Sequence, residues 1–210
     1  MKILVLGTAE QKEELLTFPA DAAIEITWIA APDHSSSYGT IDACIDLLFE
    51  NNNERIAWLK QLNASLIVIN SVVTSLHILK ENFIRINGWN TFLKRPIIEA
   101  AVTNEELKEK ATALFSLLGR QTEWVADVPG FITARVVACI INEAYMTLEE
   151  KVSVEEEVDT AMKMGTNYPY GPFEWSRKIG LVNVFHLLET LSKEQILYKP
   201  CNLLQQNALA

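Results

Sequence analysis

The sequence predicts an α/β fold in which a parallel sheet, covered by helices, is followed by an all-helical half. In the first third, short apolar segments without polar alternation recur between helix-like stretches, as in parallel sheets that are buried on both faces. After Thr103, apolar residues follow helical spacing instead. The 210 residues are enough for two small domains with real cores, which we place at residues 1–126 and 127–210.

The predicted sheet is built from short β-rich segments that are separated by polar or helix-favouring stretches. Residues 23–29 alternate for part of their length, but apolar segments without polar alternation, separated by helices, favour a parallel sheet that is covered on both faces. The predicted strands are residues 2–6, 23–29, 43–49 and 65–69, the predicted helices are residues 10–16 and 53–62, and residues 33–39 are a polar loop.

Two capping-box patterns predict helix starts in the remainder of the chain, one at Thr103 and one at Ser153. Gly119 and Gly165 are expected to end these two helices, because glycine tolerates the backbone conformation found after a last turn. Further segments are predicted as a strand at residues 122–125, a turn-rich connector at 167–173 and a helix at 181–191.

A long helix is predicted to begin at Pro129, since proline lacks the amide donor that a first helical turn leaves free. Its residues 136–141 are apolar on every side, which predicts burial all round. A short α/β half offers little cover for such a helix, so this segment favours a homodimer.

Composition excludes several classes of partner. With 27 acidic and 18 basic residues, the net charge is −9, which is unfavourable for nucleic acid or an anionic membrane surface. The first apolar segment is shorter than a signal-peptide core or a membrane span. Three scattered cysteines form neither a disulfide framework nor a zinc-binding pattern. We therefore expect a reduced, cytoplasmic protein with no metal.

The first predicted strand ends at Gly7, as in nucleotide-binding domains, where glycines allow a tight turn and close approach of a pyrophosphate. In Gly7-Thr-Ala-Glu-Gln-Lys12 only the first glycine position of that fingerprint is filled. Glu10 would also place negative charge where a phosphate should bind. The segment predicts a Rossmann-like strand and turn whose binding of NAD is weak or lost.

Several composite motifs follow in the second half, and they occur in order. Together they closely resemble the C-terminal domain of the 3-hydroxyacyl-CoA dehydrogenase family. The resemblance implies a shortened Rossmann-like domain followed by a helical dimerisation domain, and an NAD-dependent oxidation of 3-hydroxyacyl-CoA in fatty acid metabolism. The motifs are Asp127-Val-Pro-Gly-Phe-Ile132, Asn142-Glu-Ala144, Glu157-Val-Asp159, Ala161-Met-Lys-Met-Gly165, Tyr168-Pro-Tyr-Gly-Pro-Phe-Glu174 and Ile179-Gly-Leu181.

The resemblance also assigns family positions for catalysis, and several are substituted. Asn87 stands where the family has its histidine base, and Glu99 matches the glutamate that orients that histidine. Ala134 replaces the family's asparagine, and Thr74 in the Ser71–Ser75 segment takes the place of its serine. Because an amide does not titrate near neutral pH, Asn87 cannot act as a general base, and the active site is predicted to be degenerate.

The cofactor positions implied by the resemblance are Gly7, Glu50, Arg55 and Asn90. Arginine in place of the family's lysine keeps the charge but changes the geometry. The usual acidic contact to a ribose, at the end of the second strand, is absent from Ile29-Ala30-Ala31, and Asp33 is a weak substitute.

Two functional hypotheses follow. In one, the chain is a divergent NAD-dependent oxidoreductase with a relocated base, for which His77 is the candidate because it follows Thr74 by one helical turn. In the other, it is a non-catalytic, dimeric scaffold that binds an acyl-CoA-like molecule or a protein partner. His34 and His186 are expected to be structural.

Overall fold

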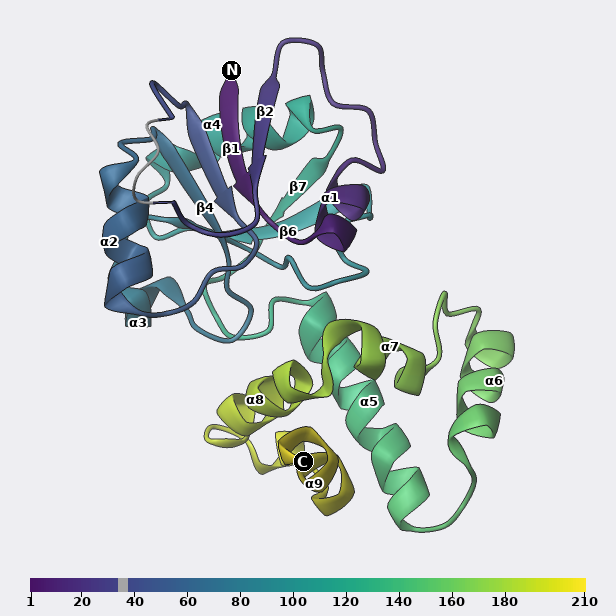
Figure 1. Cartoon of the computed structure of the whole chain (residues 1–210). Coiled ribbons are helices and arrows are strands. Elements are labelled where there is room, and N and C mark those ends of the chain that lie inside the picture. The colour runs from purple at the N-terminus through teal and green to yellow at the C-terminus, as the bar shows by residue number, and fades with distance from the viewer. Residues whose placement is uncertain (34–37) are drawn as a thin grey trace. The chain divides into compact units, whose positions relative to one another are not determined.

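The computed structural model describes residues 1–33 and 38–210, so His34 lies outside the described residues. The chain divides into two compact units, a sheet unit of residues Met1–Phe131 and a helical unit of residues Ile132–Ala210 (Figure 1). The mixed α/β class that the sequence predicts is therefore the class of the structure. None of the helices among the described residues combines the length and the apolar character needed to cross a bilayer.

The sheet unit contains a seven-stranded sheet in the order β2-β1-β3-β4-β5-β6-β7. The first five of these strands are parallel, whereas β6 runs antiparallel to β5 and pairs in parallel with β7. The predicted parallel sheet is thus confirmed, and β5 and β6 were not predicted. The strands are β1 (Lys2–Leu6), β2 (Glu25–Ile29), β3 (Ala43–Asp46), β4 (Leu66–Asn70), β5 (Ile84–Ile86), β6 (Ile97–Ala101) and β7 (Gln121–Trp124).

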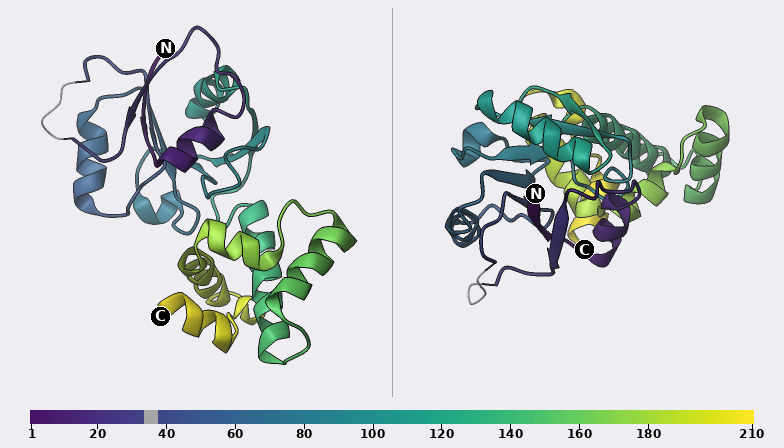
Figure 2. Two further views of the ribbon diagram at one scale, coloured as in Figure 1. Left: turned by 45° about the vertical axis from the view of Figure 1, so that its right-hand side comes forward. Right: turned by 90° about the horizontal axis from the view of Figure 1, so that it is seen from above.

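Helices cover both faces of this sheet (Figures 1 and 2). On one face, α1 (Ala9–Leu15) and α4 (Glu106–Leu117) pack into a core cluster with alternate residues of the strands. On the other face, α2 (Asn53–Gln61) and the short α3 (Leu76–Leu79) pack into a second cluster. The double cover explains why the strands read as continuous apolar segments.

The third strand is shorter than the predicted 43–49, because the chain turns away from the sheet after Asp46. The amide of Leu48 donates to Asp46 Oδ1 at 3.0 Å, which closes a local turn. The carbonyl of Leu47 accepts hydrogen bonds from side chains rather than from a neighbouring strand.

The helical unit is organised around α5, which packs against α7, α8 and α9. Helix α6 contacts α7 and α5, and of its residues only Asp159 is buried. The elements are α5 (Thr133–Glu149), α6 (Glu155–Thr166), α7 (Pro172–Ile179), α8 (Leu181–Ser192), the 3-10 turn η1 (Ile196–Tyr198) and α9 (Asn202–Leu209).

The predicted start of the long helix at Pro129 is wrong. Gly130 and Phe131 have φ values of 88° and 50°, which no α-helix contains, and the Gly130 amide donates to the carbonyl of Val72 at 2.8 Å. The segment is a turn that is bound to the sheet unit, and the helix begins only at Thr133.

Both predicted capping boxes are also wrong. The Asn104 side chain, not Thr103, accepts from the Glu106 amide at 3.0 Å. The hydroxyl of Ser153 donates to the Glu157 carboxylate instead of accepting from a backbone amide. Neither α4 nor α6 has a side-chain hydrogen bond from its N-cap residue.

Two further predictions in the helical unit need correction. Helix α6 passes through Gly165 and ends at Thr166, and Asn167, with a φ of 57°, provides the left-handed cap. Burial all round residues 136–141 is wrong for a single chain, since Val136 is 52% exposed.

Candidate functional site

Asn87 and Glu99 form a buried pair next to the antiparallel junction of β5 and β6. The register pairs Ile86 with Ala100, which brings the next residues of both strands together. The Asn87 amide donates to the Glu99 carbonyl at 3.2 Å, and Asn87 Nδ2 donates to Glu99 Oε2 at 3.1 Å. The two residues are 4% and 7% exposed.

This pair can orient groups but has no imidazole to accept a proton. The carboxylate of Glu99 receives a hydrogen bond from an amide that keeps its protons throughout the physiological pH range. The geometry therefore matches an orienting carboxylate that holds a partner, while the partner itself is not a base.

The loop that carries Asn87 is tied to α1 by two glutamates. The Thr91 amide donates to both carboxylate oxygens of Glu14, at 2.7 and 2.8 Å, and Asn90 Nδ2 donates to Glu10 Oε2 at 3.1 Å. Thr91 has a φ of 79°, a strained value for a β-branched residue, so this tether holds the loop in a costly conformation. Asn90, a predicted cofactor contact, has a protein carboxylate as its partner.

The guanidinium of Arg95 provides a positive charge that interacts with Glu99. Burial lowers the pKa of Arg95, and the charges of Glu99 and Glu14 oppose that effect. The Arg95 guanidinium also lies 4.3 Å from the centre of the Phe92 ring. A cation near two carboxylates reduces their mutual repulsion in a partly buried site.

The turn after Gly7 is closed by a capping box. The Gln11 amide donates to Thr8 Oγ1 at 3.1 Å, and the Thr8 amide donates to Gln11 Oε1 at 3.0 Å. Gln11 Nε2 reaches on to the Leu47 carbonyl at 3.2 Å, and the residue is only 6% exposed. Two amides at the start of α1, those of Thr8 and Gln11, therefore already have side-chain acceptors.

Glu50 and Arg55 line a small pocket of about 210 Å³, together with Pro32, Asn52, Glu54 and Trp58. The Arg55 guanidinium is turned inward: Nη2 donates to the Leu48 carbonyl at 3.1 Å, and Nε lies 3.6 Å from Asp46 Oδ2. The structure thus brings these two predicted residues to one place.

Asp46 is a buried ionisable residue that sequence reasoning missed. Burial raises its pKa to about 6, while Arg55 and the Leu48 amide oppose the increase. A carboxylate inside the apolar segment Ala43-Cys-Ile-Asp46 was the signal that could have identified it.

Thr74 and His77 lie on a segment that is bound to a buried ion pair. The carbonyl of Thr74 accepts from the Ser71 hydroxyl at 2.8 Å. The carboxylate of Asp127 accepts from the Leu76 and His77 amides and pairs with Arg85, which is fully buried. The His77 ring itself is 76% exposed and lies 3.9 Å from Asp127. An exposed imidazole beside an already paired carboxylate differs in environment from the buried Asn87–Glu99 pair.

The Tyr168–Glu174 motif of the helical unit, together with Asp159, caps the N-terminus of helix α7. The Asp159 carboxylate accepts from the Phe173 and Glu174 amides, at 2.8 and 3.2 Å, where α7 begins. Gly171 is required there, since an added Cβ would lie 2.3 Å from Asp159 Cγ. Glu174 Oε2 accepts from the Gly171 amide at 3.0 Å. Ala134, in the same unit, is fully buried and offers no polar group.

Comparisons with known proteins identify relatives of this chain. Residues 130–210 match the family model described as the 3-hydroxyacyl-CoA dehydrogenase, C-terminal domain. The chain is 41% identical over 115 residues to 3-hydroxyadipyl-CoA dehydrogenase of Escherichia coli K12, covering 54% of this chain and 24% of that protein. It is 35% identical over 112 residues to a probable 3-hydroxybutyryl-CoA dehydrogenase of Bacillus subtilis, covering 52% of this chain and 39% of that protein. The C-terminal domain of this chain, residues 130–210, therefore belongs to the 3-hydroxyacyl-CoA dehydrogenase family.

Solved structures support the fold over nearly the whole chain. A crystal structure of (S)-3-hydroxybutyryl-CoA dehydrogenase from Ralstonia eutropha aligns with a TM-score of 0.74 at 21% identity, covering 98% of this chain and 92% of that one. That likeness shows the fold alone. The chain spans 24% and 39% of the length of the two curated relatives above.

NAD, the cofactor that the family resemblance implies, does not fit the residues at the carboxyl end of β1. A pyrophosphate needs free amides and a close approach to the backbone at this turn. Here Gln11 occupies the turn, with Glu10 in the first turn of α1.

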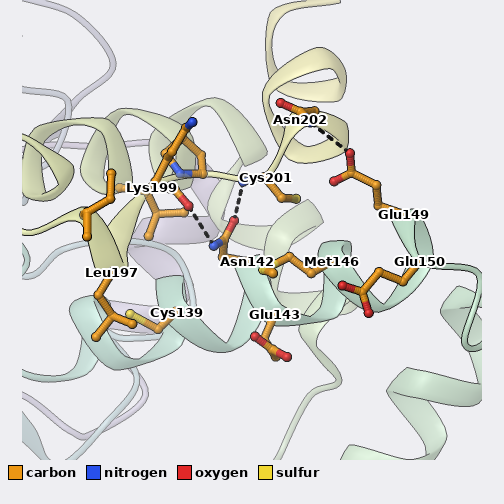
Figure 3. A pocket seen from close by; sticks show the side chains of 13 residues that line it. Cys139, Asn142, Glu143, Met146, Glu149, Glu150, Leu197, Lys199, Cys201 and Asn202 are labelled. Carbon is orange, nitrogen blue, oxygen red and sulfur yellow. Dashed lines mark hydrogen bonds between the residues drawn. The ribbon is translucent and has the colours of Figure 1, made fainter.

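The helical unit contains a larger groove of about 630 Å³, which sequence reasoning missed (Figure 3). Asn142 on α5 holds its wall in place: Nδ2 donates to the Lys199 carbonyl at 3.2 Å, and Oδ1 accepts from the Cys201 amide at 2.9 Å. The lining is mostly apolar and is bordered by carboxylates. It comprises Cys139, Asn142, Glu143, Met146, Glu149, Glu150, Leu188, Ile196, Leu197, Lys199, Pro200, Cys201 and Asn202.

The groove has no obvious catalytic group. Burial raises the pKa of the Cys139 and Cys201 thiols, which disfavours the reactive thiolate. Among the described residues, no three histidine, cysteine or acidic side chains are grouped so that they could hold a metal ion. The arrangement suits binding rather than chemistry.

Proposed function

We propose that this protein keeps the architecture of a 3-hydroxyacyl-CoA dehydrogenase without its hydride-transfer chemistry. It acts as a dimeric, cytoplasmic scaffold in fatty acid metabolism that binds an acyl-CoA-like molecule, with a protein partner as the alternative ligand. The three free cysteines agree with a reducing compartment.

The observation that carries this proposal is the closed Asn87–Glu99 pair. The side chain at the base position donates to the carboxylate and cannot take up the proton that leaves a hydroxyl group. A single acid–base group contributes about 10² to 10⁴-fold to a rate. Ala134 removes a second polar group, so little dehydrogenase activity is expected.

Dimerisation and ligand binding are supported by apolar surface on the helical unit. Val136 on α5 is 52% exposed, and Ile196 and Leu197 at the groove are 80% and 81% exposed. Exposed aliphatic side chains that lie next to a groove favour association with a partner molecule or an acyl chain.

The decisive experiment measures NADH formation from NAD and 3-hydroxybutyryl-CoA. Wild-type protein is expected to be at least about 10⁴-fold slower than the Bacillus subtilis relative assayed in parallel. A rate within tenfold of that relative would refute the proposal. Turnover that disappears in a His77→Ala variant would favour the oxidoreductase with a relocated base.

Two matched measurements test the scaffold. Light scattering at micromolar concentration is expected to report a dimer, and a monomer would contradict that part. Titration calorimetry with butyryl-CoA is expected to show binding that a Leu197→Asp variant loses, whereas His186→Ala, on an exposed helix position, leaves it unchanged. Absence of binding in wild type directs the search to a protein partner.

A further inference from the structure

The carboxyl ends of β1 and β3 mark the point at which the strand order of the sheet changes direction. The chain passes from β1 to β2 on one side and then returns to place β3 on the other side of β1. In open α/β sheets the ligand crevice lies at this switch point, outside the carboxyl ends of the strands. What occupies it therefore decides what the unit can bind.

In this protein a glutamine crosses the switch point. Gln11 Oε1 accepts from the Thr8 amide, which follows β1, and Gln11 Nε2 donates to the carbonyl of Leu47, which follows β3. An added Cβ at Gly7 would lie 3.5 Å from Gln11 Oε1, so the side chain rests against the turn itself. One side chain therefore links the segments that follow β1 and β3.

An asparagine extends the same network to the next strands. Asn70 Nδ2 donates to the Leu47 carbonyl at 3.1 Å, so this carbonyl has two donors, and Asn70 Oδ1 accepts from the Gly88 amide at 3.0 Å. A Cβ at Gly88 would lie 2.8 Å from Asn70 Cγ, which shows how closely the two segments meet.

We infer that this polar bridge, made by the side chains of Gln11 and Asn70, is a built-in occupant of the ligand crevice. Its hydrogen bonds join the segments that follow β1, β3 and β5 to Asn70, the last residue of β4, at the place where other α/β sheets bind a nucleotide. Gln11 is the residue that excludes a pyrophosphate, because it occupies the turn and the Thr8 amide at once.

Two carboxylates on α1 also disfavour the binding of a pyrophosphate. Glu10 and Glu14 lie on the helix that follows the turn, and both carboxylates are held there by hydrogen bonds from the Asn90 side chain and the Thr91 amide. A dianionic pyrophosphate would meet two fixed negative charges. The inference does not depend on the lost base at Asn87.

Amide hydrogen exchange of the full chain tests the bridge directly. In a Gln11→Met variant, which keeps the volume but not the hydrogen bonds, exchange of the Thr8 amide is expected to rise about tenfold. In Asn70→Ala the same increase is expected at Gly88. The exposed controls Gln61→Ala and Asn51→Ala are expected to change neither.

Ligand exclusion is tested in the same experiment with NAD at about millimolar concentration. Wild-type amides at Thr8 and Gly88 are expected to exchange at the same rate with and without NAD. Added protection, or an increase in Tm of more than about 2 °C, would overturn the inference, as would unchanged Thr8 exchange in Gln11→Met. Absent dehydrogenase activity cannot produce either result, so the two proposals fail separately.

Discussion

Two buried aspartates, one in each unit, differ in the hydrogen-bond donors that their carboxylates receive. Asp159 in the helical unit is 6% exposed and accepts from two amides of α7, with Arg177 3.5 Å from its second oxygen. Asp46 in the sheet unit is fully buried, yet its main partners are one amide and a guanidinium at 3.6 Å. Burial accordingly raises the pKa of Asp46 to about 6.

The part of the chain that most resembles the family forms a structural cap in the helical unit. The motif around Gly171 is complete because each member takes part in one cap: the glycine makes room, the aspartate accepts, and Glu174 closes the box. Asn87 and Glu99, at the positions where the resemblance implies a histidine and its orienting glutamate, are joined by a side-chain hydrogen bond, and neither is an imidazole. High similarity in the helical unit is therefore evidence of packing, and activity has to be judged at the sheet unit.

The largest expected effect comes from breaking the complete motif. A Gly171→Ala variant places a methyl group 2.3 Å from Asp159 Cγ and 2.4 Å from its Cβ, so helix α6 or the cap must move. We expect the free energy of unfolding to fall by about 3 kcal/mol or more. Urea denaturation followed by circular dichroism measures it.

Gly165 provides the matched control for that variant. It lies inside α6 with nothing within 4 Å of an added Cβ, so Gly165→Ala is expected to stabilise the helix by about 0.5 to 1 kcal/mol. Equal losses in both variants would show that the Asp159 cap is not the reason for Gly171.

The second-largest expected effect is a pH dependence of the unfolding free energy that is caused by Asp46. Because the pKa of Asp46 is raised in the folded protein, folding favours the protonated form, and this stability is complete below about pH 4 and lost as the pH rises through 6. We expect the unfolding free energy to fall by on the order of 2 to 3 kcal/mol across that interval. Asp46→Asn should remove this dependence.

Urea denaturation between about pH 4 and pH 7.5 measures the difference between wild type and Asp46→Asn. Asp42→Asn is the control, since Asp42 is exposed in the same unit. A difference between wild type and Asp46→Asn that does not vary with pH would contradict the assignment to this carboxyl group.

The smallest effect is expected at the Asn87–Glu99 pair. Glu99→Gln keeps an oxygen acceptor for Asn87 Nδ2 while it removes a buried charge, so stability should change by less than about 1 kcal/mol. Glu123→Gln, at the directly paired and exposed position on β7, serves as the control. A loss above about 3 kcal/mol would show that the charge of Glu99 is needed for folding.

Local pattern predicted five of the seven strands in the described sheet, but it predicted the helix ends poorly. Apolar segments such as residues 65–69 become strands because their side chains are buried on both faces of the sheet. Helix ends depend on single hydrogen bonds, as at Asn104, and on backbone angles, as at Phe131, which periodicity does not record. The pairing of Asn87 with Glu99 followed from resemblance, and the antiparallel strands β5 and β6 that create it were not predicted.

By itself, the sequence determined that the chain is an α/β protein with a helical second half, that its motifs resemble the dehydrogenase pattern, and that Asn87 stands where the resemblance implies a histidine. Only the tertiary structure decided which polar groups meet across long stretches of chain. Gln11 reaches Leu47, which is 36 residues away, and Arg85 pairs with Asp127, which is 42 residues away. Periodicity reports neighbours within a turn or a strand, whereas such contacts depend on the path of the whole backbone.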